Sequence, residues 1–473
     1  MRPSRRYRMA IIAAAMLLLI PLAVHFVVGW IARLEPPQVA VEPLTVSQPN
    51  GNVRVAGQST MQRRGEILEV RLVGDAATVG YSHARLLLPE IVEVENALYA
   101  GLRERVPWWL ARKALFDWAQ WRFRNVDESM SAARRQELAG QALGFDPDPF
   151  TSVFPTYQRL VYLSALYDIG LSFERAPLLG CTTFLLPDSA DDGGVLLARA
   201  FDFEVDEVFD RRKVVFLVKE TGQIPFASVA WAGLVGVVSG MNVEGLTVVA
   251  HGARAGEHEI RGEPVVHELR RLLSRAQTLN EALSALGART PMVSHIVIVA
   301  DAKGNAAAIE RVPGRADHVR RLRPPDVVTN HFEGPSAEDP KNQEVLEMTS
   351  TRARRQRGQM LLGTLAPAPT AADAVALLRD RRGVDGKPLP LGDRRAINAL
   401  IAAHGVVAEP RTRSLWVSES PSLLGRFVRF DLSLLLADRY DPRSAQPRLE
   451  AIPADPLRHA DTYLQWRAGS HRD

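Results

Sequence analysis

The sequence predicts an α+β fold that follows an N-terminal transmembrane helix. An apolar run occupies residues 9–32, which is about the length that a helix needs to cross a bilayer. Residues 79–142 have the pattern of helices separated by short breaks. Beyond Cys181 the pattern changes to short segments with a period of two, which is typical of strands. Many short strands with helices between them indicate a layered α+β domain.

Length and composition fit a globular protein of one large or two ordinary domains. The chain has 473 residues, of which 46% are hydrophobic and 24% charged. Its net charge is +4, and its arginines are scattered among acidic residues without a dense basic block. Because a nucleic-acid-binding face needs clustered basic residues, we expect no nucleic-acid partner.

Basic residues precede the apolar run, since residues 2–8 are rich in arginine. Positive charge before a membrane helix keeps the N-terminus in the cytoplasm. The sequence therefore predicts a membrane contact through residues 9–32, with the rest of the chain on the periplasmic or extracellular side. No evident Ala-x-Ala cleavage site follows the run, which favours an uncleaved signal anchor over a cleaved signal peptide.

Strands and helices alternate irregularly in the remainder of the chain. Strands are expected at residues 66–73, 182–186, 195–203, 213–219, 226–232, 235–239, 246–251, 295–300, 306–311, 414–418 and 426–432. Further helices are expected at residues 160–170, 264–277, 279–286, 340–363, 371–380 and 394–403. The turn-forming residues 188–194 predict a hairpin between the second and third of these strands.

Cys181 is the only cysteine of the chain, so no internal disulfide can form. A lone cysteine is either a small buried hydrophobic residue or a nucleophile. The sequence has no phosphate-binding loop, no glycine-rich dinucleotide motif, no His-Glu-x-x-His and no Gly-x-Ser-x-Gly. Its histidines are dispersed. We therefore predict no metal and no cofactor.

The residues around Cys181 resemble those of the N-terminal-nucleophile hydrolases. Gly180-Cys-Thr-Thr183 precedes a Gly-Gly hairpin and an Arg-x-x-Asp motif that runs from Arg199 to Asp202. The other matching pieces, in order, are Gly240-Met-Asn-Val-Glu-Gly-Leu246, Val327-Val-Thr-Asn-His-Phe332, Ser350-Thr-Arg352 and Leu415-Trp-Val-Ser418. Together they resemble the penicillin acyltransferase-like family and, more distantly, the choloylglycine hydrolases. The resemblance covers about residues 70–435 and implies a four-layer αββα sandwich.

The resemblance implies that the chain cuts itself between Gly180 and Cys181. A free cysteine thiol has a pKa of about 8.5 and needs a base at neutral pH. If Cys181 is N-terminal, its own α-amino group, with a pKa of about 7.7–8.0, can be that base. This explains why the nucleophile needs no histidine partner. The small and large chains are then expected to stay associated.

Four more residues are expected in the catalytic site from the resemblance. Arg199 lies beside the sulfur, where a cation favours the thiolate, and Asp202 orients the α-amine. Asn330 donates a hydrogen bond to the oxyanion of the reaction. Arg352 matches a site arginine of the family, although the other arginines at 354, 355 and 357 leave the register open.

Two positions depart from the family pattern. Ala200 stands where relatives often have an asparagine after the motif arginine. Gly252 stands near the position where the bile-salt branch has a substrate-facing asparagine, which weakens a bile-salt assignment. His251 and Gly252 are kept as candidate substrate-binding residues.

The predicted division is into a basic tip with membrane helix (1–34), a linker (35–65), a mainly helical pro-segment or small chain (66–180) and the catalytic chain (181–473). Residues 107–123 mix Trp and Phe with Arg and Lys, so they form either an amphipathic helix packed on the core or a helix that contacts a membrane or a lipid-like substrate.

The predicted reaction is hydrolysis of an amide bond in a small N-acyl compound, through a thioester on Cys181. The acyl group of this substrate is expected to be apolar. An exported enzyme does not meet acyl-coenzyme A, which favours water as the acyl acceptor. The alternatives are an acyltransferase that uses an amine acceptor, an enzyme active without chain cleavage, and a catalytically silent, membrane-tethered binding protein.

Overall fold

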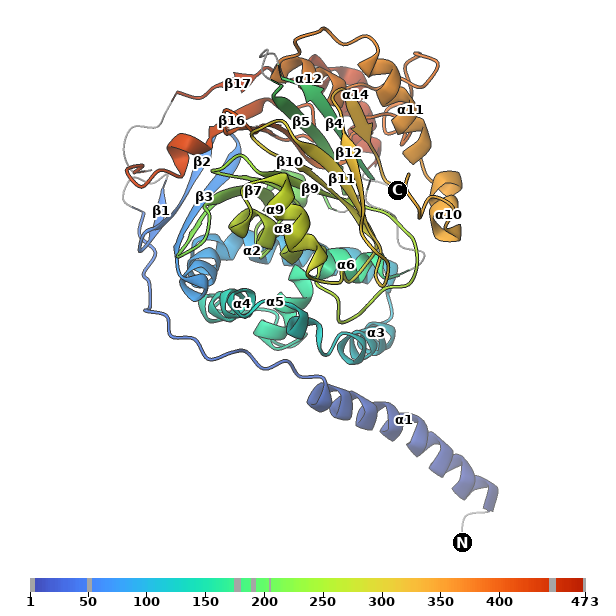
Figure 1. Ribbon diagram of the computed structural model, residues 1–473. Helices are drawn as coiled ribbons and strands as arrows, with labels where there is room; N and C mark the ends of the chain where they lie inside the picture. The colour runs from blue at the N-terminus through green and yellow to red at the C-terminus, as the bar shows by residue number, and fades with distance from the viewer. Residues whose placement is uncertain are drawn as a thin grey trace.

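The computed structural model describes residues 5–48, 53–173, 180–188, 193–203, 206–441 and 448–470. Two sheets dominate these residues, with strand orders β1-β2-β3-β6-β7-β8-β9-β10-β11-β12 and β13-β4-β5-β14-β15-β16-β17 (Figure 1). The first sheet contains β1 (Arg54–Ala56), β2 (Ser59–Arg64), β3 (Ile67–Gly74), β6 (Lys213–Glu220), β7 (Phe226–Trp231), β8 (Ser239–Asn242), β9 (Thr247–Gly252), β10 (His295–Ala300), β11 (Ala306–Arg311) and β12 (His318–Leu322). The second contains β4 (Gly180–Pro187), β5 (Val195–Asp202), β13 (Asp326–Val328), β14 (Ala402–Glu409), β15 (Ser414–Ser418), β16 (Phe427–Asp431) and β17 (Ala451–Ile452).

The helices fall into groups along the chain. The described helices before β4 are α1 (Arg5–Ile31), α2 (Ala76–Arg105), α3 (Trp109–Arg122), α4 (Ala132–Gly144), α5 (Thr156–Ser164) and α6 (Leu166–Leu171), with the 3₁₀-helix η1 (Val126–Ser129). Those after it are α7 (Val208–Arg211), α8 (Val265–Arg275), α9 (Leu279–Gly287), α10 (Pro340–Met348), α11 (Thr351–Leu362), α12 (Ala371–Leu378), α13 (Leu432–Leu435), η2 (Pro456–His459) and α14 (Asp461–Ser470).

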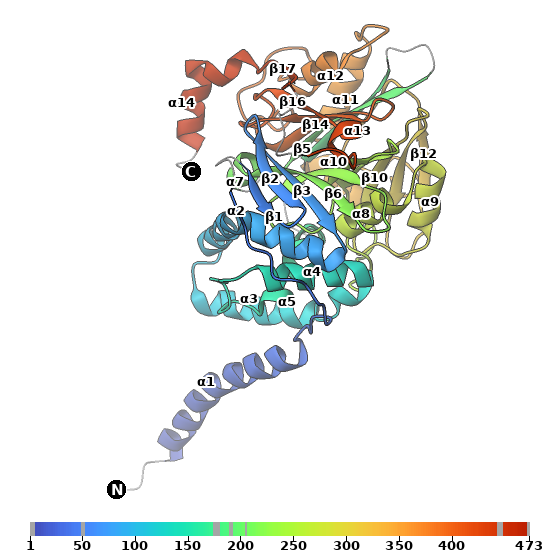
Figure 2. The same ribbon diagram turned by 90° about the vertical axis from the view of Figure 1, so that its left-hand side faces the viewer.

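The hydrophobic clusters show that the layers follow the order helix, sheet, sheet, helix (Figure 2). The inner faces of the two sheets meet in two clusters, for example where Leu217 and Val229 of the first sheet share a cluster with Val417 and Phe430 of the second. The outer face of the first sheet packs on α2, α4, α5 and α8. The outer face of the second sheet packs on α12.

Strand β4 lies inside the second sheet, between β5 and β13. In the antiparallel pair of β4 and β5, Cys181 lies opposite Phe201 and Gly180 opposite Asp202. The sequence from Gly180 to Pro187 has two small residues, then two threonines, then apolar residues, and the strand is almost wholly buried. Burial between the other sheet and a helix layer holds this strand firmly in place.

The transmembrane helix of the predicted fold class is wrong. Among the described residues, no helix has both the length and the apolarity needed to span a membrane, a task that takes about 20 consecutive apolar residues. Helix α1 covers residues 9–31 of the predicted anchor, which was expected at residues 9–32, but Pro21 and His25 interrupt its apolar run. His25 Nδ1 lies 2.7 Å from Asp117 Oδ1 of α3. The predicted membrane contact through this helix is therefore unsupported.

Several predicted elements differ from the observed ones. The helix expected at residues 394–403 is wrong, since β14 begins at Ala402. The strand expected at 235–239 begins only at Ser239. Four residues of the predicted hairpin loop, 189–192, lie outside the described residues. Residues 107–123 contain α3, whose Phe116 packs against the core while Trp109, in its first turn, is 60% exposed.

Candidate active site

Cys181 is the second residue of β4 and is completely buried. Arg199 Nη2 donates a hydrogen bond to its sulfur over 3.4 Å. The sulfur also lies 3.9 Å from the carbonyl oxygen of Ala250 in β9. Burial raises the pKa of the Cys181 thiol, and the positive charge of Arg199 opposes this rise. If Cys181 were only a small hydrophobic core residue, there would be no reason for a buried guanidinium to contact its sulfur.

Arg199 reaches the sulfur from the neighbouring strand β5, where it is buried. Its Nη1 donates to the carbonyl oxygen of Val238 over 2.5 Å and to Ser239 Oγ. Its Nη2 also donates to the carbonyl oxygen of Ala250. These acceptors belong to the first sheet or its connections, so Arg199 crosses the space between the sheets. A guanidinium held by several fixed acceptors keeps its charge in one place.

Asp202 is the last residue of β5 and packs against Gly180. A methyl group placed on Gly180 would lie 2.9 Å from Asp202 Oδ2 and 3.0 Å from its Cβ. Only glycine therefore fits beside the carboxylate without displacing it. Residues three apart on a regular strand face opposite sides. Here Asp202 ends the strand, and the pairing of β5 with β14 is shifted between Ala402 and His404, so Arg199 and Asp202 both approach the Gly180–Cys181 bond.

Asn330 follows β13 and binds the backbone of Cys181. Its Oδ1 accepts hydrogen bonds from the backbone nitrogen of Cys181 (2.7 Å) and from Arg354 Nη2 (2.9 Å). Its Nδ2 donates to the carbonyl oxygen of Gly252 (2.9 Å). In this uncut chain Asn330 Nδ2, the predicted oxyanion donor, thus donates to the carbonyl oxygen of Gly252. Asn330 Oδ1 binds the backbone nitrogen of Cys181, which would become the α-amine if the chain is cut.

Arg354, rather than Arg352, is the second arginine at Cys181. Arg354 is buried in α11, and its Nη1 donates to the carbonyl oxygen of Cys181 (2.5 Å) and to Thr182 Oγ1 (2.9 Å). Arg352 lies in the first turn of the same helix and is exposed. Residues two apart on a helix do not share a face. The arginine that contacts Cys181 is therefore in the same helix as the one expected from the sequence, two residues later.

His251 and Gly252 end strand β9 next to this group. His251 is buried, with Nε2 2.7 Å from Thr183 Oγ1 and Nδ1 3.1 Å from the carbonyl oxygen of Thr329. Burial and the charge of Arg199 lower its pKa well below the usual value, so it is a neutral bridge between β4, β9 and the residue that follows β13. His251 does not line the cavity described below. Gly252 contributes its carbonyl oxygen to Asn330 and faces α6, where Leu171 Cδ2 lies 3.4 Å from the position of its missing side chain.

Sequence reasoning missed three supporting side chains. Ser239 Oγ accepts from Arg199 and lies 2.9 Å from His404 Nε2. Thr351 Oγ1 accepts from the backbone nitrogen of Asn330 (2.8 Å) and thereby ties the start of α11 to the end of β13. Arg354 was noted only as a neighbour of Arg352. Ser and Thr are common throughout the chain, so no local pattern marks the two that serve this site.

A cavity of about 500 Å³ begins beside Asp202. Phe203, the residue after Asp202, and Ala402, which pairs with Asp202, both line it. The other lining side chains include the aromatic residues Phe209, Tyr463 and Trp466 and the charged residues Asp206, Glu207, Asp210, Arg211, Arg394 and Arg467. The space is therefore apolar on some walls and charged on others. Within the described part of the chain, no group of His, Cys, Asp and Glu is arranged to hold a metal ion.

Part of the chain that contains these residues matches the model of a known protein family. Residues 189–387 match the family model described as acyl-coenzyme A:6-aminopenicillanic acid acyl-transferase. This match confirms the family resemblance. The matched range contains Arg199, Asp202, Asn330 and Arg354, and it begins after Cys181. A search of curated proteins found no match.

Solved structures with a partial likeness were also found. An N-acylethanolamine-hydrolyzing acid amidase ortholog from Caenorhabditis elegans is 17% identical, with 49% of this chain and 93% of that chain covered and a TM-score of 0.37. Penicillin V acylase from Agrobacterium tumefaciens is 16% identical, with 55% and 89% covered and a TM-score of 0.36. A variant of conjugated bile acid hydrolase from Clostridium perfringens is 11% identical, with 58% and 97% covered and a TM-score of 0.37. TM-scores this low support no argument about function. The resemblance to a known family therefore rests on the match to the family model.

Proposed function

We propose that the protein is a cysteine amidase of the N-terminal-nucleophile type, which cuts its own Gly180–Cys181 bond and then hydrolyses a small N-acyl compound. The observation that carries this proposal is the buried contact of Arg199 with the Cys181 sulfur, next to a backbone nitrogen held by Asn330. A cation fixed against the sulfur favours the thiolate, which is the nucleophilic form of a cysteine. The match to an acyl-transferring family supports the same class of reaction.

The self-cleavage step uses the bond that precedes the nucleophile. The Cys181 sulfur attacks the carbonyl carbon of Gly180, the C–N bond breaks, and the nitrogen of Cys181 takes up a proton to become an amine. Water then hydrolyses the resulting thioester and releases the new carboxyl group of Gly180. Gly180 suits this step because Asp202 occupies the space that any side chain would need.

In the cut enzyme the α-amine of Cys181 acts as the base. It accepts the thiol proton while the sulfur attacks the carbonyl carbon of the substrate amide, and it passes that proton to the leaving amine. Asn330 Oδ1 already accepts a hydrogen bond from this nitrogen. Asp202 lies beside Gly180, whose carbonyl group is separated from this nitrogen when the chain is cut. Both groups therefore orient the amine toward the sulfur. Water afterwards cleaves the acyl thioester and returns the thiol.

The apolar part of the substrate has a candidate site in the cavity beside Asp202. Phe203, Phe209 and Trp466 give it aromatic walls, and burial of each CH₂ group contributes about 0.8 kcal/mol to binding. An apolar acyl group of several carbons fits such walls, as expected from the sequence. The charged residues of the same cavity suit the polar end of a small molecule.

A second candidate is transfer of the acyl group to an amine. The matched family is described as an acyl-transferase, which favours this reaction. The expectation of an outward-facing enzyme, which argued against acyl-coenzyme A, rested on a membrane helix that is not present among the described residues. Hydrolysis needs no acceptor site beyond those described, so we place it first.

The experiment that tests this function measures amine release from a series of N-acyl amides with acyl chains of increasing length. Wild-type protein should release amine and free acid, with a rate that rises with chain length, and the Cys181→Ala variant should release neither. Addition of a free amine should leave the amount of free acid unchanged. A new N-acyl product at the expense of free acid would establish the transferase instead, and equal turnover by Cys181→Ala would refute the nucleophile.

A further inference from the structure

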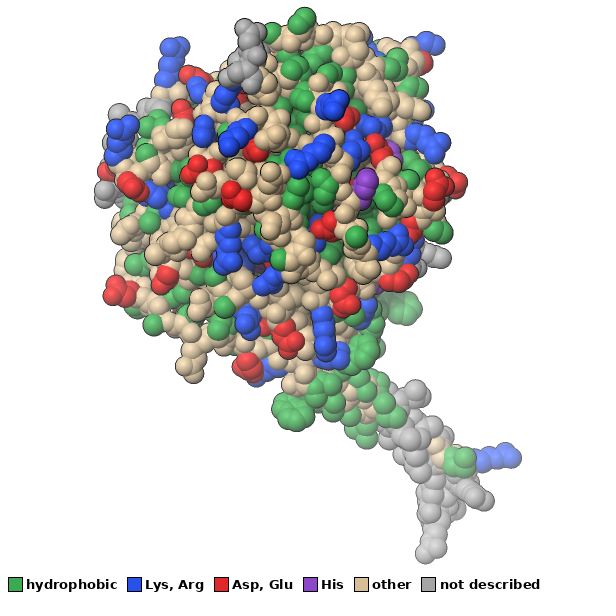
Figure 3. All heavy atoms as spheres, in the orientation of Figure 1, with side chains coloured by type: hydrophobic (Ala, Val, Ile, Leu, Met, Phe, Trp, Pro, Cys, Tyr) green, Lys and Arg blue, Asp and Glu red, His purple; other side chains and the backbone are tan. Residues whose placement is uncertain are grey.

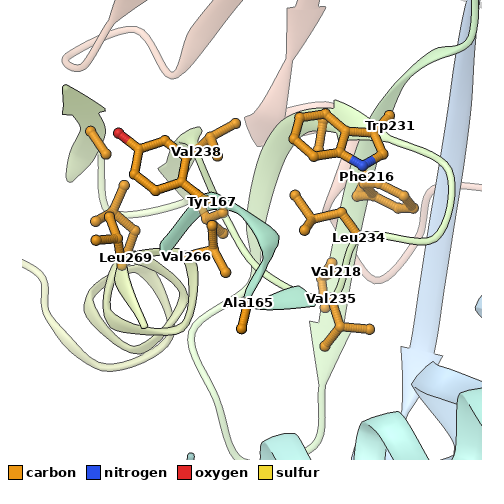
Figure 4. Close-up of a cluster of buried hydrophobic side chains, with 14 of the residues drawn as sticks. Ala165, Tyr167, Phe216, Val218, Trp231, Leu234, Val235, Val238, Val266 and Leu269 are labelled. Atoms are coloured by element: carbon orange, nitrogen blue, oxygen red, sulfur yellow. The ribbon is translucent and has the colours of Figure 1, made fainter. Parts of the chain in front are cut away.

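Tyr167 in helix α6 has a buried hydroxyl group that lacks a hydrogen-bond partner within the described part of the chain. The side chain belongs to a large apolar cluster that also contains Val238, Val266 and Leu269 (Figure 4). Buried hydroxyl groups are nearly always satisfied, because an unpaired one loses its bonds to water without replacement. A phenylalanine would fill the same space at no such cost, so the hydroxyl calls for an explanation.

The hydroxyl lies at the edge of the Cys181 site. A methyl group placed on Gly252 would lie 3.7 Å from the Tyr167 oxygen. The carbonyl oxygen of the same Gly252 accepts from Asn330, which in turn binds the nitrogen of Cys181. The charges of Cys181 and Arg199 both act on the phenol. Because Gly252 has no side chain, the hydroxyl approaches the backbone of β9, in which the carbonyl oxygen of Ala250 lies 3.9 Å from the Cys181 sulfur.

We propose that Tyr167 is a catalytic residue whose hydroxyl donates a hydrogen bond to the carbonyl oxygen of the scissile amide, and to the oxyanion that forms from it. The proposal rests on the function proposed above. It assigns the unpaired hydroxyl a partner that is present only when substrate is bound. The tyrosine keeps its proton throughout, and no bond to it forms or breaks.

The electrostatic surroundings favour a donor in this position. Burial raises the pKa of Tyr167 well above its usual value, and the negative charge of the Cys181 thiolate acts in the same direction. The phenol therefore stays protonated at any working pH. Asn330 Nδ2, the donor expected from the sequence, already donates to Gly252. A donor pre-placed where charge develops stabilises the transition state more than the bound substrate.

This assignment gives the segment before Cys181 a part in the chemistry. Tyr167 precedes Gly180, so after cleavage it belongs to the small chain and the nucleophile to the large chain. The active site is then complete only while both chains remain together. Helix α6 is held to the large chain by Asp168, whose carboxylate accepts from the backbone nitrogen of Val265 at 3.0 Å and 3.1 Å.

The test compares Tyr167→Phe with wild-type protein on the N-acyl amide that wild type hydrolyses best. Rates are divided by the number of reactive Cys181 thiols, which are titrated with a thiol-reactive probe. We expect kcat to fall about 100-fold to 1,000-fold, as when one oxyanion donor is removed, with KM changed less than about threefold. The melting temperature should stay equal or rise, because an unpaired buried hydroxyl is removed.

The matched control is Tyr162→Phe, one helix earlier. The Tyr162 hydroxyl accepts from Gln158 Nε2 at 2.9 Å, so its loss should lower the melting temperature and leave kcat per thiol unchanged. An unchanged kcat in Tyr167→Phe, with wild type active, overturns the role of Tyr167 and leaves the amidase function intact. If wild type itself releases no amine from any amide of the series, the amidase function fails and the role of Tyr167 fails with it.

Discussion

At the scale of single residues, hydrogen bonds fix the backbone of Cys181 as well as its sulfur. Its nitrogen donates to Asn330, and its carbonyl oxygen accepts from Arg354. Arg354 also donates to Asn330 Oδ1, so the three residues form a closed set of hydrogen bonds. Burial lowers the pKa of Arg354, and the charges of Asp202 and Cys181 oppose this. The planar guanidinium can serve these acceptors together, which an ammonium cannot do.

Replacement of Arg354 by lysine should therefore be far from conservative. The variant keeps the positive charge but loses the fork that spans Cys181 and Asn330, and bonds to a charged group are worth about 1.5–3 kcal/mol each. We expect chain cleavage and amide hydrolysis to slow at least tenfold. The measurement is the rate of amine release per milligram of folded protein.

The control for this variant is Arg352→Lys, which lies in the same helical turn and is exposed. It should change neither rate by more than about twofold, since exposed substitutions shift stability within about 0.5 kcal/mol. A loss of activity in Arg352→Lys with normal activity in Arg354→Lys would show that the arginine expected from the sequence serves the site.

At the scale of elements, α11 positions the site through one close approach. A methyl group on Gly358 would lie 2.8 Å from Val327 Cγ2 of β13 and 3.2 Å from Phe184 Cε1 of β4. Gly358 lies one turn after Arg354 and faces the same strands. Glycine thus lets the helix approach β4 closely enough for Arg354 to reach the backbone of Cys181.

The Gly358→Ala variant should push α11 away from the sheet. Overpacking of a buried contact costs about 1–3 kcal/mol, so we expect a lower melting temperature together with slower amide hydrolysis. Gly363→Ala, at the end of the same helix, meets only an ordinary contact of 3.4 Å with the carbonyl oxygen of Met360. That control should melt at the wild-type temperature or above it. Equal activity and stability of both variants would contradict the close approach.

The elements also show how much the sequence alone can predict. Strands that consist of a short, mostly apolar run, such as β6, β10 and β11, were predicted within a residue or two of their observed ends. Strand β14 was missed, because its sequence Ala402–Glu409 contains small residues and a glycine, and its burial comes from β5 and β15 on either side. Tertiary contacts decide such a segment, and they are absent from a local pattern.

The candidate site was predictable only in part, for a similar reason. The family motifs lead to Cys181, Arg199, Asp202 and Asn330, which the structure brings together from β4, β5 and the end of β13. The choice between Arg352 and Arg354 depends on which face of α11 is turned toward β4. The sequence does not show this, because arginines occur on several faces of the helix. Tyr167 belongs to no motif, and it is marked only by a buried hydroxyl that has no hydrogen-bond partner among the described residues.

At the scale of the whole molecule, Arg, Lys, Asp and Glu are interspersed over the face of the globular body seen in Figure 3, and titratable groups lie deep inside it. Burial and the charge of Arg270 lower the pKa of His83 to about 3, and burial with Arg134 and Arg270 lowers that of His267 to about 3. Burial raises the pKa of Glu95 to about 7. These buried groups link the stability of the fold to pH.

The histidines predict a loss of stability in acid. Between pH 6.5 and 3 each is neutral in the folded chain and protonated in the unfolded chain, so the free energy of unfolding falls as pH drops, by about 1.4 kcal/mol per pH unit for each. Between about pH 7 and 4.5 Glu95 is protonated in the folded chain and ionised in the unfolded chain. In this range its contribution to the free energy of unfolding rises as pH drops and cancels that of one histidine. The melting temperature should therefore fall steadily below pH 6.

The variant His83→Gln tests this linkage. His83 Nε2 accepts from the backbone nitrogen of Gly233 at 3.1 Å, and a glutamine oxygen can take its place. The slope of the free energy of unfolding between pH 6 and 4.5 should become smaller by about 1.4 kcal/mol per pH unit. His459→Gln, at an exposed position, should keep the wild-type slope. An unchanged slope in His83→Gln would show that this histidine is not neutral in the folded chain.

The central claim concerns the bond between Gly180 and Cys181, and the intact mass of the purified protein tests it most directly. Wild-type protein should separate under denaturing conditions into residues 1–180 and residues 181–473, and N-terminal sequencing of the second chain should begin with Cys181. Cys181→Ala should remain a single chain of 473 residues. A wild-type protein that stays uncut and still hydrolyses an N-acyl amide would contradict the claim that Cys181 carries its own base.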